Sequence, residues 1–217
     1  MFLDLIGSGV TGANFVIISL AYLIVIVLSL SLHEFGHAFA AVRSGDNTPK
    51  VTGRLSLNPM RHMDVIGLIC CAFFGFGWAR PVQINPSNFR NIKKGLVWTS
   101  LAGVIVNLIL AFLGYGLYEA TLLIQSNNYF VLFLQVFFSC LSRINLCLLV
   151  FNLLPIYPLD GFKIVEATTK YNNSNVQFMY RYGSLILVAV VFVFDGLLLR
   201  LINLIEIPIK LFWQLIF

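Results

Sequence analysis

The sequence predicts an all-α integral membrane protein, folded as a single domain over residues 1–217. Hydrophobic residues make up 59% of the chain and charged residues only 11%, against about 25% charged residues in a typical soluble domain. Residues 5–32 carry no charged side chain, and about 20 apolar residues are enough to cross a bilayer as a helix. We therefore expect five to six transmembrane or re-entrant helices, with a small membrane-associated β element.

The first half of the chain divides into four sections. Residues 5–32 form the first predicted span, and the section 43–64 is a polar loop with four basic residues. Residues 65–79 are uncharged, contain three glycines and are short for a crossing, which favours a re-entrant or interfacial element. Residues 80–86 include two prolines and alternate apolar with polar side chains, a pattern typical of an edge strand.

The second half contains three more predicted spans. Two are expected at about residues 95–118 and 130–153, and the latter is followed by Pro155 and Pro158, which end or unwind a helix. A last span is expected at about residues 182–199. The remaining residues, 200–217, either extend this span or lie in the membrane interface.

The positive charge is better explained by topology than by a nucleic-acid partner. The formal net charge is +5, but the basic residues lie in the loops between apolar spans, where they commonly set orientation. This distribution predicts a multi-pass protein of the cell (plasma) membrane whose 43–94 and 155–181 sections face the cytosol, and no nucleic-acid binding. The four cysteines lie within apolar segments, so we expect them to be reduced.

The candidate reactive residues begin with His33, Glu34 and His37, which follow the first apolar run. Residues four apart share a helix face, so both histidines can bind one metal ion with Glu34 beside them as a base. A catalytic zinc ion usually takes three protein ligands and one water. Asp160 is the best candidate for the third ligand because it follows the double-proline break and the predicted topology brings it level with the histidines.

These motifs resemble the site-2 protease family of intramembrane zinc metallopeptidases (peptidase family M50). The resemblance rests on the residues 33–37, on Asn152, and on Leu159-Asp160-Gly161. The sections 75–82 and 102–107, the latter with Ala102, Gly103 and Asn107, also resemble the family's small forms, which have no PDZ or CBS domain. Two residues depart from it, since Val104 and Tyr157 stand where the family often has proline.

The resemblance implies that His33, His37 and Asp160 bind one zinc ion, which activates a water molecule, and that Glu34 acts as the general base. It further implies that a transmembrane protein substrate is cut within the lipid bilayer. Asn152 and Asn107 have two possible roles: each could position the substrate or the transition state, or each could only stabilise the helix bundle through a hydrogen bond.

Two other groups of residues have structural explanations that we favour. His62 and Asp64 could form a second metal site, but in a basic loop they are more often structural. Arg143 lies inside a predicted span, where an ionisable residue usually has a partner, and pairing with Asp195 would lock two spans together.

Residues 81–85 have a possible functional role. They could accept a substrate by strand addition, in which main-chain hydrogen bonds hold the substrate.

The sequence thus predicts an intramembrane zinc metalloprotease. The main alternative is a non-catalytic membrane scaffold that binds transmembrane helices and uses the metal structurally. An ion or proton transporter would explain Arg143 and Asp195 but would leave Glu34 without a role. The complete set of His33, Glu34, His37 and Asp160 favours the protease over both.

Overall fold

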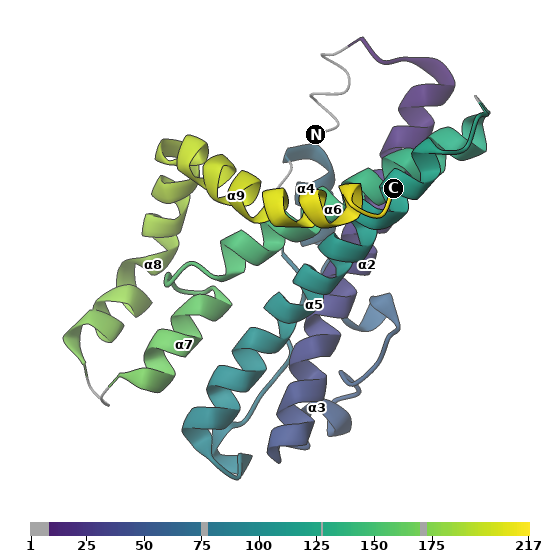
Figure 1. Cartoon of the computed structure of the whole chain (residues 1–217). Helices are drawn as coiled ribbons and strands as arrows, with labels where there is room; N and C mark the ends of the chain where they lie inside the picture. The colour runs from purple at the N-terminus through teal and green to yellow at the C-terminus, as the bar shows by residue number, and fades with distance from the viewer. Residues whose placement is uncertain (1–8, 75–77, 127, 170–172) are drawn as a thin grey trace.

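The computed structural model describes residues 9–74, 78–126, 128–169 and 173–217, and the fold of this part is helical (Figure 1). The long helices are α2 (Gly12–Ser44), α5 (Ile92–Leu122), α6 (Tyr129–Asn152), α8 (Ser174–Val193) and α9 (Asp195–Gln214). The short ones are α3 (Thr48–Val51), η1 (Pro59–Arg61), α4 (Val65–Phe74), η2 (Pro86–Asn88) and α7 (Asp160–Thr168). The all-α prediction is confirmed for these ranges.

Helix α2 is longer than the first predicted span, and this places the candidate ligands inside a helix. It continues from the apolar run through residue 44 and ends at Gly45, which has a φ of 114°. Glycine adopts this left-handed conformation without the steric cost that a side chain would add. Arg43 lies in the last turn, where a positive charge interacts favourably with the helix dipole. His33 and His37 therefore lie on a continuous helical face.

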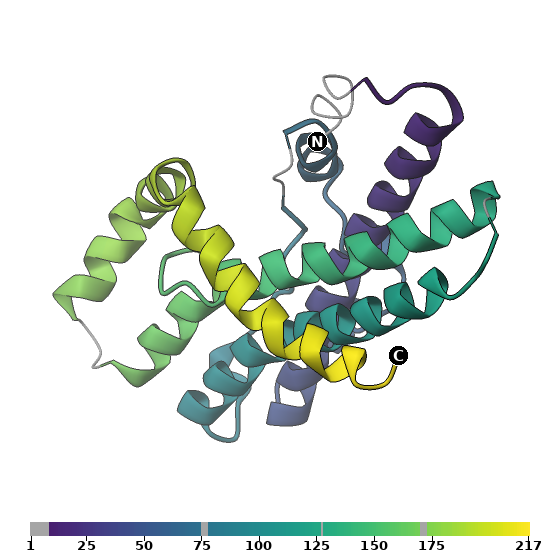
Figure 2. The same cartoon turned by 45° about the horizontal axis from the view of Figure 1, so that its top comes forward.

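Helices α2, α5 and α6 pack together as the central bundle (Figures 1 and 2). Small residues allow their backbones to approach closely, as is common between membrane helices. A Cβ atom added at Gly36 would lie 3.1 Å from the carbonyl oxygen of Ala102, and one at Gly114 would lie 2.8 Å from the backbone nitrogen of Ser142. The positions of α2 and α6 are thus both set by contacts with α5.

Three helices, α2, α5 and α6, are long and apolar enough to cross a membrane, and α8 with α9 would make a fourth if the bent pair counts as one span. No more than 33% of the most apolar stretch of any of these three helices is buried inside the protein, so their apolar side chains face outward, where lipid can cover them. The predicted count of five to six is not confirmed. Helix α4 has 10 residues, about 15 Å of helix, which is too short to cross a hydrocarbon core of about 30 Å.

The last predicted span differs most from the structure. Helices α8 and α9 meet at Phe194 and are bent by 79°, so α9 lies across the bundle (Figures 1 and 2). It is attached to α5 through Trp213, whose Nε1–H donates to the carbonyl oxygen of Phe112 over 2.9 Å. A Cβ atom at Gly116 would overlap the Trp213 ring. Residues 200–217 therefore pack against α5 and α6 instead of extending a straight span.

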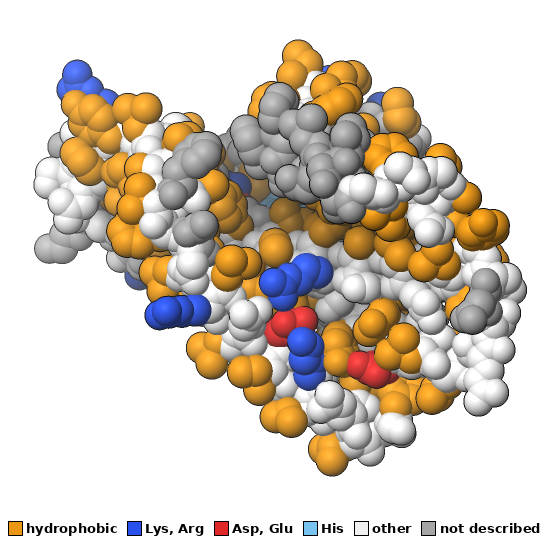
Figure 3. Space-filling model, turned by 90° about the horizontal axis from the view of Figure 1, so that it is seen from above, with side chains coloured by type: hydrophobic (Ala, Val, Ile, Leu, Met, Phe, Trp, Pro, Cys, Tyr) orange, Lys and Arg blue, Asp and Glu red, His pale blue; other side chains and the backbone are white. Residues whose placement is uncertain are grey.

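Arg143 connects α6 to α9 through two residues of α9. Its guanidinium lies 3.2 Å from the carboxylate of Glu206 and donates to Asn203; Lys210 also lies 3.2 Å from Glu206. The side chain of Asp195 lies outside the described part. Figure 3 shows a group of basic and acidic side chains among hydrophobic ones on one face of the molecule.

The predicted edge strand at residues 80–86 is not confirmed. The segment is extended and its side chains alternate between half-buried and exposed, but the only β pairing of the described residues is an isolated bridge between Met63 and Ala79. Pro81 and Pro86 have no N–H to donate to a neighbouring strand. The segment is held by separate hydrogen bonds, described below.

Polar contacts inside the bundle give the first testable prediction. Asn145 of α6 is fully buried and donates to Oγ of Ser29 on α2 over 2.8 Å. We expect Asn145→Ala to lower the free energy of unfolding by about 0.6–1.7 kcal/mol, the range measured for hydrogen bonds between membrane helices. Unfolding in mixed micelles measures this change, and Cys147→Ala, at an exposed position of the same helix, is the control. Equal stability of both variants would contradict the prediction.

Candidate metal centre

His33 and His37 direct their rings to the same point from one face of α2. Both are buried, with 6% and 4% of their surface exposed. Their Nε2 atoms lie 3.0 Å apart, and the two rings are perpendicular. The spacing of four residues therefore produces the convergence that the sequence predicts.

Asp160 reaches the histidines from the first turn of α7. Helix α6 ends at Asn152, and a short irregular segment reverses the chain before α7 begins at Asp160. The next residue, Gly161, packs so tightly that a Cβ atom would overlap the carbonyl oxygens of Leu153 and Leu154. The close packing of this turn brings the Asp160 carboxylate, which is only 4% exposed, into the bundle.

The three ligand atoms match the geometry of a zinc site. Oδ2 of Asp160 lies 3.2 Å from Nε2 of His33 and 3.0 Å from Nε2 of His37, so the ligand atoms form a nearly equilateral triangle. Zinc–ligand distances of about 2.0–2.1 Å in a tetrahedron require ligand atoms about 3.3 Å apart. In addition, Oδ2 of Asp160 is buried without a hydrogen-bond partner. These residues fit zinc, and they are the one cluster of this kind among the described residues.

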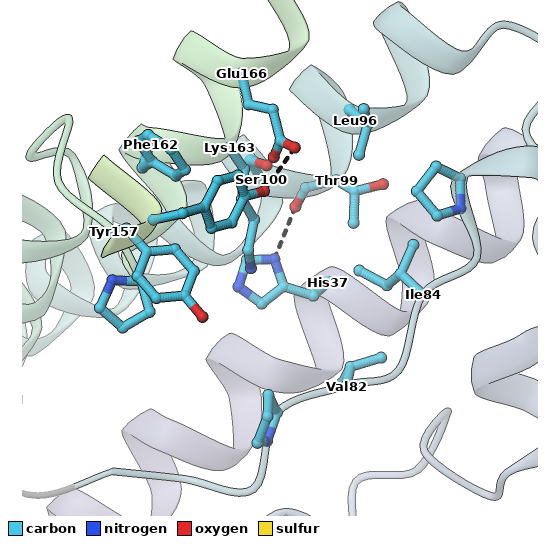
Figure 4. Close-up of a pocket in the computed structure, with 14 residues that line it drawn as sticks. His37, Val82, Ile84, Leu96, Thr99, Ser100, Tyr157, Phe162, Lys163 and Glu166 are labelled. Atoms are coloured by element: carbon cyan, nitrogen blue, oxygen red, sulfur yellow. Dashed lines mark hydrogen bonds between the residues drawn. The ribbon is translucent and has the colours of Figure 1, made fainter. Parts of the chain in front are cut away.

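Helix α5 orients both imidazole rings. Nδ1–H of His37 donates to the carbonyl oxygen of Thr99 over 2.7 Å (Figure 4). A carbonyl can only accept, so in neutral His37 the lone pair is on Nε2, the atom that faces His33 and Asp160 and that would bind a metal ion. The side-chain amide of Asn107 lies 3.0 Å from Nδ1 of His33. With its oxygen turned to that nitrogen, Asn107 accepts the Nδ1–H and its otherwise unpartnered Oδ1 is satisfied.

Gly103 supplies the space for these rings. A Cβ atom there would lie 2.6 Å from Cε1 of His33 and 2.6 Å from Nε2 of His37. Thr99, Gly103 and Asn107 are spaced four residues apart, so they lie on one face of α5. This face therefore contains a hydrogen-bond partner for each histidine and a gap between them.

Lys163 completes the surroundings of Asp160. Its Nζ lies 2.9 Å from Oδ1, the carboxylate oxygen that faces away from the histidines. The ammonium group beside it favours the ionised form of the Asp160 carboxyl. Asp160 is thus available as a carboxylate ligand.

Glu34 is half-buried beside the ligands and has a backbone partner. Its Oε2 accepts the N–H of Val82 over 2.9 Å. Val82 belongs to the extended segment that was predicted as an edge strand. The structure therefore joins this segment to the candidate base, a contact that the sequence gives no reason to expect.

A pocket of about 310 Å³ opens beside His37. Val82 and Ile84 lie on one side of it, and Tyr157 and Phe162 lie on the opposite side (Figure 4). The pocket is mostly apolar and reaches a ligand of the candidate metal centre. It is therefore suited to hold an apolar chain segment next to the candidate metal centre.

The other candidate residues are placed as follows. Asn152 ends α6 and donates to the carbonyl oxygen of Leu148, so its role in substrate positioning stays a prediction. His62 is buried and forms a hydrogen bond from Nε2 to the Ser56 carbonyl, while Asp64 accepts from the N–H of Gly67 in α4. Both of these residues have local structural contacts, as favoured from the sequence.

Comparisons with known proteins agree with this geometry. The model of peptidase family M50 matches residues 121–194. YwhC of Bacillus subtilis, named as a candidate zinc metalloprotease, is 42% identical over 153 residues, which cover 67% of this chain and 68% of that protein. Rip2 of Mycobacterium tuberculosis, with the same description, is 41% identical over 146 residues, which cover 64% of this chain and 54% of Rip2. No solved structure gives a significant match.

Gly103 provides a test of the packing around the ligands. We expect Gly103→Ala to weaken zinc binding about 5- to 150-fold, because overpacking costs about 1–3 kcal/mol and here the strain falls on two ligand rings. Zinc titration with a competing chelator measures the affinity. Gly196→Ala is the control, since a Cβ atom there meets nothing within 4 Å. Unchanged affinity in Gly103→Ala would show that the rings do not bind the metal in this arrangement.

Asn107 tests the orientation of His33. We expect Asn107→Leu to lower zinc affinity about 10- to 100-fold, the usual cost of losing the partner of a ligand histidine. Asn107→Asp keeps an acceptor for Nδ1–H and should bind zinc within a few-fold of the unaltered protein. Equal losses in both variants would contradict this role and indicate a packing effect instead.

Proposed function

This chain belongs to peptidase family M50 and is a zinc metalloprotease, and we propose that it hydrolyses peptide bonds within or near transmembrane segments of membrane proteins. The observation that carries the proposal is the position of the metal centre. Two of its ligands lie on α2, which is long and apolar enough to span a membrane, and all three are buried against the central bundle. A scaffold with a structural metal, or a transporter, would not require Glu34 beside this ligand set.

The protein's own residues account for the proton transfers of peptide hydrolysis. Bound zinc would lower the pKa of a coordinated water and polarise the substrate carbonyl. Glu34 acts as the general base that accepts the proton of the attacking water, and afterwards donates it to the leaving amine. The N–H of Val82 holds the Glu34 carboxylate through one oxygen. Asn107 and Thr99 keep the two histidines in the orientation that exposes Nε2.

The substrate lies along the extended segment 81–86 in this proposal. Val82, Ile84 and Pro86 line the pocket beside His37, while Gln83 is exposed. No hydrogen bond in the described part of the chain engages the backbone N–H of Gln83 or Ile84. Successive N–H groups of an extended chain point to opposite sides, so a stretch of substrate that has unwound from its helix can pair with one of these two groups by strand addition. Main-chain hydrogen bonds would then hold its carbonyl beside the metal centre.

The site opens towards the cytosol in the proposed topology. Positive residues flank the inner ends of the spans, in the sections 43–94 and 155–181, and such loops are retained on the cytosolic side. This is the end of α2 at which His33 and His37 lie. Water would thus reach the site from the cytosol, and the protein would reside in the cell membrane.

Glu34→Gln tests the function. We expect this variant to keep zinc and its unfolding temperature, and to lose about 10²- to 10⁴-fold in kcat, the usual contribution of a general base. The assay is cleavage of a transmembrane-helix substrate by the purified protein in liposomes, with zinc content measured on the same samples. Glu119→Gln, near the other end of α5, is the matched control. Turnover by Glu34→Gln equal to that of the control would refute the mechanism.

A further inference from the structure

Asp46 is a buried carboxylate just beyond the end of α2, outside the metal centre. It is 0% exposed, and the described structure shows no cation paired with it. Neutral donors satisfy it instead. Oδ1 accepts the backbone N–H of Thr48 over 3.0 Å and the side-chain amide of Asn88 over 2.8 Å, and Oδ2 accepts the backbone N–H of Asn85 over 2.7 Å. The Thr48 hydroxyl is a further donor to Oδ1.

This carboxylate attaches one end of the extended segment to α2. Asn85 and Asn88 follow Pro81, Val82 and Ile84, which line the pocket. The attachment is reinforced by the N–H of Arg90, which donates to the carbonyl oxygen of Ser44 over 3.0 Å. Gly45 permits the close approach, because a Cβ atom there would lie 3.0 Å from the carbonyl oxygen of Asn88.

The other end of the segment has its own attachment. The N–H of Arg80 donates to the carbonyl oxygen of His62 over 2.7 Å, next to the bridge between Met63 and Ala79. Between the two ends, the contact with the metal centre is the N–H of Val82 on Glu34. Three residues of extended chain, about 10 Å, connect Val82 to Asn85. A shift at Asn85 is therefore transmitted to Val82.

We propose that Asp46 is a positioning residue that fixes the extended segment 81–86 and helix η2, and thereby holds the N–H of Val82 against the candidate base Glu34. The inference rests on the proposed function for its effect on turnover, but the placement of the segment can be measured independently. Asp46 acts through main-chain groups of the segment and touches neither substrate nor metal.

The carboxylate form is required because only donors face the side chain. An asparagine at this position would have one acceptor oxygen and one NH₂ group. If the oxygen stayed with the donors of Thr48 and Asn88, the NH₂ would face the N–H of Asn85, and that donor would stay unpaired. Burial by itself raises the pKa of the Asp46 carboxyl, but the hydrogen bonds from Thr48, Asn88 and Asn85 outweigh it and hold this pKa below its ordinary value.

The experiment exchanges the two side chains across this contact. Asp46→Asn should keep zinc but lose about 100-fold in kcat, the order of loss that a displacement of about 1 Å can cause. Asn88→Asp should also lose activity, because it places two carboxylates next to each other. In the double variant the amide at position 46 can donate to the carboxylate at position 88 while its oxygen accepts from Asn85. We expect the double variant to recover at least 10-fold over Asp46→Asn.

Hydrogen–deuterium exchange of the same proteins reports the segment directly. The amides of Val82 and Asn85 should exchange at least 10-fold faster in Asp46→Asn, and the double variant should reverse this change. Asp64→Asn is the matched control, because Asp64 is a nearby carboxylate that accepts the N–H of Gly67. It should leave exchange at both amides unchanged.

The outcomes separate this proposal from the proposed function. If the unaltered protein cleaves no transmembrane substrate, the proposed function fails, and the exchange rates alone decide whether Asp46 holds the segment. Unchanged exchange at Val82 in Asp46→Asn would overturn the positioning role, whatever the activity. Two other results would also overturn the positioning role: a loss of activity that the double variant does not restore, and a loss of zinc in Asp46→Asn. Either result indicates general damage to the fold.

Discussion

The close approach of α2 and α5 is the constraint on which the rest of this structure depends. Gly36 lets the two backbones meet, and Gly103 leaves the gap that the His33 and His37 rings fill. The same face of α5 carries the two groups that orient these rings. Larger residues at these contacts would separate the helices, and the rings would lose both their space and their hydrogen-bond partners. Helix packing and ligand geometry are therefore one structural feature.

The candidate metal centre also accounts for the burial of polar groups in an apolar bundle. Three lone pairs converge within 3.2 Å of one another, and Oδ2 of Asp160 has no hydrogen-bond partner. Without an ion this arrangement is unfavourable, because buried acceptors that face each other lose their hydration without gaining a donor. Zinc binding would remove that cost, so folding of α7 against α5 and metal binding are expected to be coupled.

Polar residues elsewhere in the bundle show where sequence patterns were informative and where they were not. A charge inside an apolar span predicts a partner, and Arg143 has one. The partner in the structure is Glu206, which comes close to α6 because the bend between α8 and α9 lays α9 across the bundle. Similarly, the alternation at residues 80–86 correctly predicts extended backbone with two different faces. It does not reveal that prolines leave the segment without a partner strand.

The sequence by itself determined the helical class and predicted the candidate metal-binding histidine pair with Asp160 as its third ligand, because these depend on apolar length, on helical periodicity and on ligand chemistry. Only the tertiary structure decided how the ligands are held. The Thr99 carbonyl and the N–H of Val82 are main-chain groups, and every residue has such groups, so no side-chain pattern marks them. No sequence pattern marks Asp46 either. A carboxylate after Gly45 is typical of an ordinary turn, and only the fold brings Asn85 and Asn88, about forty residues later in the chain, into contact with it.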